Sequence, residues 1–260
     1  MKPSHRVLLW SSAACGALCA VVATAPASWV ASALGSASAQ RVQLAEARGS
    51  WRDGSALLVL RGGGQSEDAA LAPGRLSWHV GLGELWRGRV RLQLHDTAIS
   101  PQPLQLAIAW QPSAWQLRLM APWNARLPAA LLQGLGTPWN TLALQARLDL
   151  SMRDLELGSA AGRATLRGEV GLDALDVASR LTQVAPLGSY RLRLHGDGAS
   201  ATVRLSTIAG PLQLTGDGVW NGQQWHFNGR GSAAPQRAAE LASLLGLLGQ
   251  PDGDHVRITL

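Results

Sequence analysis

Apolar and polar residues alternate strictly in many short runs of this 260-residue sequence. Clear runs cover residues 104–110, 142–150, 190–194, 201–205, 225–227 and 256–260. Successive side chains of a strand point to opposite faces, so this alternation gives each strand one buried and one wet face. A sheet with one wet face favours antiparallel over parallel pairing. We therefore predict a mainly β domain, built as an antiparallel, twisted, hairpin-rich sheet.

Turn signals separate these runs. Gln111-Pro112-Ser113 lies between two of them, and Asn221-Gly222 lies between two more. An Asn-Gly pair favours a type I′ hairpin, because both turn residues need positive φ. Residues 62–74, with three consecutive glycines, are typical of a loop.

Helical patterns are few and short. Pro235–Leu248 carries leucines and alanine at helical spacing, with proline suited to the first turn and Gly249 to the stop. Residues 128–135 and 173–181 could each form a turn or two of helix. We expect one or two short helices beside the sheet.

Tryptophan supplies nearly all of the large aromatic volume, because it occurs eleven times while Phe and Tyr occur once each. Several tryptophans shortly precede a glycine at a predicted strand end, as in Leu85-Trp86-Arg87-Gly88. We interpret this pattern as an indole packed beside a turn. Trp220 and Trp225 flank the Asn-Gly pair, and we predict a structural role for both in the core.

An uncharged run extends from Val7 to Leu34, preceded by Lys2 and Arg6. About 20 apolar residues suffice to cross a bilayer as a helix. The flanking basic residues should stay in the cytoplasm. We therefore predict a single N-terminal transmembrane helix within about residues 7 to 30. The expected organisation is a cytoplasmic stub and anchor over residues 1–34 and a periplasmic β-rich domain over residues 35–260.

A cleaved signal peptide is the alternative, with small-residue sites near residues 25 and 39. The run is longer than a usual signal core, and Trp29 would suit the membrane–water interface. Under both interpretations the same domain is exported across the inner membrane. The only cysteines, Cys15 and Cys19, lie in the run, so the exported part can form no disulfide.

The formal charge is +6, and every basic residue except Lys2 and the histidines is arginine. No basic cluster interleaved with aromatics is present, so we expect no nucleic-acid partner. Arg87, Arg89 and Arg91 alternate, which would place them on one face of a strand. They are candidate contacts for an acidic partner, and a solvated strand face is the plainer interpretation.

Signals for catalysis are missing from the sequence. No two histidines have the i, i+4 spacing of a helical zinc pair, and no cysteine lies outside the uncharged run. His95 and His195 end similar strands and could meet. Asp252 and Asp254 flank a glycine and could hold a cation, although a turn is the plainer interpretation. We predict no catalytic, cofactor-binding or metal residues, no cofactor and no small-molecule substrate.

Three stretches carry a resemblance to a known family: residues 42–56, residues 210–222, and residues 244–254 with the closing strand 256–260. Across them the chain resembles type II secretion system protein N. The resemblance implies an inner-membrane component with a periplasmic domain. It would help to connect the inner-membrane platform and clamp protein with the outer-membrane secretin during export of folded proteins.

A second hypothesis is a membrane-anchored, lipid-handling module of the AsmA-like kind, which also combines an anchor with long antiparallel strands. A lipid carrier needs an apolar face left open, whereas a scaffold should close its face or expose only a compact patch. The state of the apolar sheet face therefore bears on the choice.

Overall fold

The computed structural model describes residues 24–62, 69–133, 142–160, 162–221 and 223–259. Residues 7–23 of the predicted anchor lie outside this part of the chain. Within it, no helix is long and apolar enough to cross a membrane. The end of the uncharged run instead belongs to helix α2 (Ala27–Ala37), whose first residue, Ala27, is only 1% exposed against the sheet.

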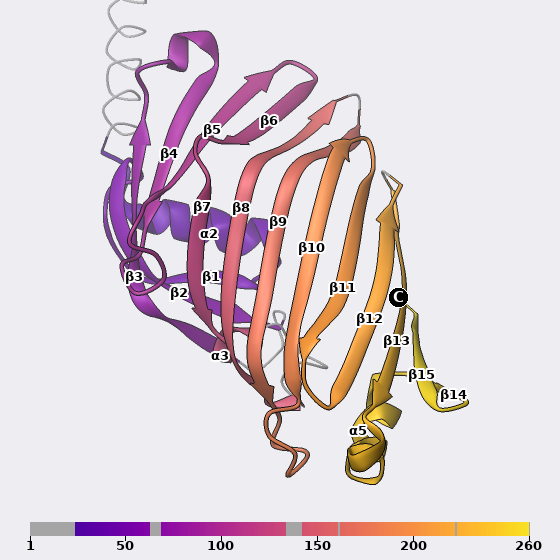
Figure 1. The fold of residues 1–260 in the computed structure, drawn as a ribbon. Coiled ribbons are helices and arrows are strands. Elements are labelled where there is room, and N and C mark those ends of the chain that lie inside the picture. The colour runs from indigo at the N-terminus through magenta and orange to yellow at the C-terminus, as the bar shows by residue number, and fades with distance from the viewer. Residues whose placement is uncertain (1–23, 63–68, 134–141, 161, 222, 260) are drawn as a thin grey trace, which may run out of the picture.

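The described chain forms one antiparallel sheet of fifteen strands, which confirms the mainly β prediction (Figure 1). The strands are β1 (Val42–Gly49), β2 (Asp53–Arg61), β3 (Ala69–Gly81), β4 (Arg89–His95), β5 (Leu104–Gln111), β6 (Ala114–Leu119), β7 (Trp123–Pro128), β8 (Gln145–Ala160), β9 (Arg163–Ala178), β10 (Gly188–Gly198), β11 (Ala201–Ala209), β12 (Leu212–Trp220), β13 (Trp225–Ala233), β14 (Gln250–Asp252) and β15 (His255–Thr259). Most neighbours in the sheet are neighbours in sequence, except that β6 pairs with β8, which also pairs with β7, and that β15 lies between β13 and β14.

The helices are equally short. They are α2, α3 (Ala130–Gln133), α5 (Ala238–Leu248) and the 3-10 turns η1 (Leu85–Arg87) and η2 (Pro235–Arg237). The predicted helix over 235–248 is confirmed as η2 followed by α5, and the turn predicted within 128–135 is α3.

Two local predictions are wrong. The helix considered for residues 173–181 is strand up to Ala178, because β9 pairs there with both β8 and β10. The loop predicted for 62–74 gives way at Ala69 to β3, which pairs with β2 from its first residue. In both places tertiary pairing overrides the local pattern.

The registers collect apolar side chains on one face of the sheet. Leu150, Leu172, Leu192 and Leu205 lie in one row across four strands. Where β8 carries a bulge between Arg153 and Glu156, the extra residue changes the phase of the alternation. Apolar residues on both sides of the bulge therefore keep the same face.

The helices pack on this apolar face at the two ends of the sheet. In Figure 1 the sheet is strongly curved and α2 lies on its inner side. There Ala27 packs with Ala56 and Trp78 of β2 and β3. At the other end, α5 inserts Leu241, Leu244 and Leu245 into the largest buried cluster.

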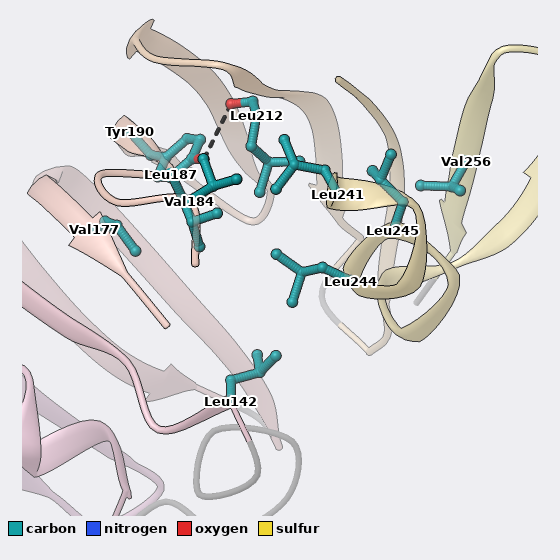
Figure 2. Close-up of a cluster of buried hydrophobic side chains, with 10 residues drawn as sticks. All are labelled: Leu142, Val177, Val184, Leu187, Tyr190, Leu212, Leu241, Leu244, Leu245 and Val256. Atoms are coloured by element: carbon teal, nitrogen blue, oxygen red, sulfur yellow. Dashed lines mark hydrogen bonds between the residues drawn. The ribbon is translucent and has the colours of Figure 1, made fainter. Parts of the chain in front are cut away.

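That cluster joins α5 to β12, β10 and β15, as Figure 2 shows. Leu241 lies beside Leu212, and Leu245 faces Val256. The Tyr190 hydroxyl donates a hydrogen bond to the Leu212 carbonyl oxygen at 3.0 Å. Burial raises the pKa of the Tyr190 hydroxyl above its ordinary value, so the group stays protonated as this donor.

Candidate interaction surfaces

The three candidate arginines do not form one row. Arg87 belongs to η1, and only Arg89 and Arg91 lie on β4, so the prediction of a shared strand face is wrong for Arg87. Gly88, with φ of +67°, turns the chain between them. The Arg87 guanidinium carbon lies 4.1 Å above the Trp86 ring centroid, a cation–π arrangement. Arg91 pairs with Glu84, which leaves Arg87 and Arg89 as the uncompensated charges of the set within the described residues.

The histidine and carboxylate candidates are kept apart. His95 ends β4 and His195 lies on β10, with β5, β6, β8 and β9 between their strands in the sheet. Asp252 pairs with Arg257 and His255 across the turn between β14 and β15. In the described ranges no group of three His, Cys, Asp or Glu side chains could hold a metal ion.

On the polar face of the sheet, ion pairs join neighbouring strands. Asp173 on β9 accepts from Arg191 at 2.9 Å and from Arg193 at 2.7 Å, both on β10. Similar cross-strand pairs join Arg126 to Asp149 and Arg204 to Asp217. Each exposed pair contributes little by itself, about 0–1 kcal/mol.

Two shallow depressions lie on the polar face. One, of about 610 Å³, is lined by the β4–β5 connection and by Asp149, Asp173 and Arg193. The other, of about 480 Å³, includes Glu156 and Arg167. The hydrogen bond from Arg191, with further attraction from Arg193, lowers the pKa of Asp173 below its ordinary value of 3.8. A carboxylate held ionised in this way serves as an acceptor for arginine and is unsuited to donating a proton at neutral pH.

This lowered pKa predicts a pH-dependent contribution to stability. Replacing Asp173 by asparagine should lower the free energy of unfolding at pH 7 by about 1 kcal/mol. A carboxylate whose folded pKa is depressed stabilises the fold above its unfolded pKa and loses that effect as the pH falls through the folded pKa. Urea unfolding of wild type and Asp173→Asn should therefore differ at pH 7 and converge below pH 4.

Asp254→Asn provides the control for this comparison, because Asp254 lies exposed in the β14–β15 turn. Its stability should follow that of wild type at both pH values. A difference between Asp173→Asn and wild type that stayed constant down to pH 3 would contradict the assignment.

Five tryptophans lie at strand ends and turns on one side of the sheet: Trp86, Trp110, Trp115, Trp220 and Trp225. We call this row of strand ends and connections the tryptophan edge. Antiparallel strands place alternate connections at the same edge, so η1 and the β5–β6 and β12–β13 hairpins lie together along the upper edge in Figure 1. Trp110 is paired with Trp115, and Trp220 with Trp225. The rings of the second pair are 5.6 Å apart between centroids.

These indoles are far from buried. Trp86 is 75% exposed, Trp110 52%, and Trp115 and Trp225 45% each. The prediction that Trp225 packs in the core is therefore wrong, and Trp220 is half-buried against it. The connection also differs from the predicted two-residue turn. Four residues separate the paired tryptophans, and the Asn221 side-chain oxygen accepts from the backbone N–H groups of Gln223 and Gln224.

The apolar face of the central strands is only partly covered. The half-buried side chains there are Leu157, Leu166, Val170, Leu172, Leu192, Leu194 and Val203. The buried clusters under α2 and α5 lie toward the two ends of the sheet. The centre between them therefore leaves apolar side chains accessible.

The tryptophan edge escaped the sequence interpretation, although one signal was present. Trp86 and Trp220 each stand just before a turn, and this pattern was interpreted as packing. Only the register shows that the tryptophan-bearing turns share one edge and project into solvent.

The chain was compared with models of known protein families. The model of a family described as type II secretion system (T2SS), protein N matches residues 40–259. No curated protein and no solved structure matches the chain. The matched range takes in every strand of the sheet, from β1 to β15.

Proposed function

The chain belongs to the type II secretion system protein N family, and on that basis we propose that it is a non-catalytic, inner-membrane-anchored part of this machine. Its periplasmic domain links the inner-membrane platform with the outer-membrane secretin during export of folded proteins. The family match over residues 40–259 carries the proposal. The uncharged run ahead of Pro26, with Lys2 and Arg6 before it, supports the anchor.

The shape of the sheet supports a linking role. Strands β8 and β9 have 16 residues each, which at about 3.3 Å per residue makes each roughly 50 Å long. Ion pairs on the polar face join these two strands to their neighbours β7 and β10. A sheet with strands this long can present separate binding surfaces to different partners at the two ends of its strands.

Site-specific crosslinking in intact cells tests the partners. A photoreactive residue replaces Arg89, an exposed arginine at the start of β4, in the full chain. A second replaces Gln236, which is exposed in η2 at the opposite edge. We expect at least one position to yield an adduct with a platform, clamp or secretin component that disappears when that component is deleted. Adducts formed only with proteins outside the secretion system would contradict the linking role.

The accessible apolar centre of the sheet favours one second candidate, the AsmA-like lipid-handling module. On that account phospholipid should copurify with the protein and should be lost when Leu192 is replaced by arginine, which puts a charge on the apolar face. The control is Thr202→Arg, on the exposed polar face of β11. A scaffold without lipid cargo predicts the same low lipid content in all three proteins.

A further inference from the structure

We propose that the tryptophan edge rests in the headgroup layer of a bilayer that contains anionic phospholipids. The proposal concerns how the domain stands on a membrane, and it holds or fails independently of a role in secretion. Three features of this edge carry it: exposed indoles, uncompensated arginines and the place where the chain enters the sheet.

The indoles have the placement that a lipid interface needs. They project from turns at strand ends, and four of the five are 45–75% exposed. Tryptophan combines a large apolar body with an N–H donor, so it is favoured where a surface is apolar on one side and wet on the other. At the opposite edge the exposed large side chains of the described residues are aliphatic, such as Leu181 and Leu247.

Charge at this edge is positive. The exposed side chains Arg52, Arg87, Arg89 and Arg163 lie in its connections or at its strand ends, and within the described ranges none has an ion-pair partner. Of the acids nearby, Glu84 is paired with Arg91, Asp53 contacts His79, and Asp197 accepts a hydrogen bond from the Ser200 hydroxyl. The four arginines therefore outnumber the two carboxylates that have no arginine partner. Free arginines beside indoles suit anionic headgroups, because the guanidinium reaches the phosphates while its stem lies along the apolar layer.

The chain also enters the sheet at this edge. The Trp51 backbone N–H donates to the Ala25 carbonyl at 3.0 Å, and Pro26 bridges to Ser50 in the β1–β2 connection. That connection lies at the same edge as η1, because the Val80 N–H donates to the Arg52 carbonyl. The uncharged residues 7–23 are therefore joined to the domain here. A membrane segment joined at this edge would hold the tryptophans against the bilayer surface.

The test measures the distance of each edge from lipid. Full-length protein with Cys15→Ala and Cys19→Ala is reconstituted in phosphatidylethanolamine–phosphatidylglycerol liposomes. A single cysteine is added at Ser113, in the turn between Trp110 and Trp115, or at Gln236, at the opposite edge, and is labelled with an environment-sensitive fluorophore. Lipids with a nitroxide in the headgroup region then quench the fluorescence.

We expect quenching of the Ser113 label to be several-fold greater than that of the Gln236 label. Adding Trp86→Ser, Trp220→Ser and Trp225→Ser should reduce quenching at Ser113 while the far-UV circular dichroism stays unchanged. Equal quenching at the two edges would overturn the proposal, as would quenching at Ser113 that the folded tryptophan variant leaves intact. If the variant does not fold, the comparison of the two labels still decides. A Ser113 label that the nitroxide lipids leave unquenched would also overturn the proposal.

Discussion

Replacing Leu241 by alanine should lower the free energy of unfolding by about 2–5 kcal/mol, the range for emptying a leucine site in a packed core. Leu241 is fully buried, with 0% exposure, and lies at the centre of the cluster that joins α5 to the sheet. Its side chain packs beside Leu212 (Figure 2), so its loss leaves a cavity between helix and strands. The backbone hydrogen bonds within α5 and between the strands limit how far the surrounding structure can close this cavity.

Leu247→Ala is the matched control, because Leu247 lies on the same helix and is 65% exposed. Both substitutions have nearly the same effect on helix propensity, so their difference isolates the buried contact. Chemical denaturation should show Leu247→Ala close to wild type. Equal losses from the two variants would mean that α5 does not seal this end of the sheet.

Gly210→Ala should destabilise the fold by about 2–4 kcal/mol, through strain and overpacking together. Gly210 joins β11 to β12 and has φ of +124°, a conformation that side chains with a Cβ rarely adopt. A Cβ there would lie 2.2 Å from the Gly188 Cα and 2.7 Å from the Leu187 carbonyl oxygen. Both atoms are backbone, and Leu187 is itself bonded to Leu212 across this corner, so relief requires the strands to separate.

The control for this substitution is Gly246→Ala in α5. A Cβ at Gly246 meets nothing within 4 Å, and alanine is favoured over glycine in a helix by about 0.5–1 kcal/mol. The two glycine-to-alanine changes should therefore have opposite signs in thermal unfolding. A stable Gly210→Ala protein would contradict the close approach at the β10–β11–β12 corner.

The sheet itself could be predicted because period-two alternation is a local property of each strand. The α5 helix was predictable for the same reason, since Pro235 and Gly249 mark its limits locally. The strand over residues 173–178 could not be predicted, because the local pattern also allows a helix. Pairing of β9 with β8 and β10 makes these residues a strand. The length of the turn at Asn221 could not be predicted from the Asn-Gly pair. The backbone N–H groups that bond to the Asn221 side chain belong to Gln223 and Gln224, which follow that pair.

Surfaces were harder to predict than strands. Arg87, Arg89 and Arg91 have the spacing of one strand face. However, the chain turns at Gly88, which has a positive φ, so β4 begins only at Arg89 and excludes Arg87. The tryptophan edge depends on which strand ends meet, and this follows from the order of the whole sheet. Composition showed eleven tryptophans and left open whether they fill a core or line an edge.

Export of a folded type II substrate, measured in cells with and without this gene, decides whether the chain serves secretion. Deletion should lower the amount of substrate in the medium or destabilise a neighbouring component of the machine. Wild type should restore export, and so should folded His95→Ala or His195→Ala variants, because the proposed role involves no catalysis. Unchanged export after deletion, together with an altered lipid composition of the outer membrane, would contradict the secretion role and favour lipid handling.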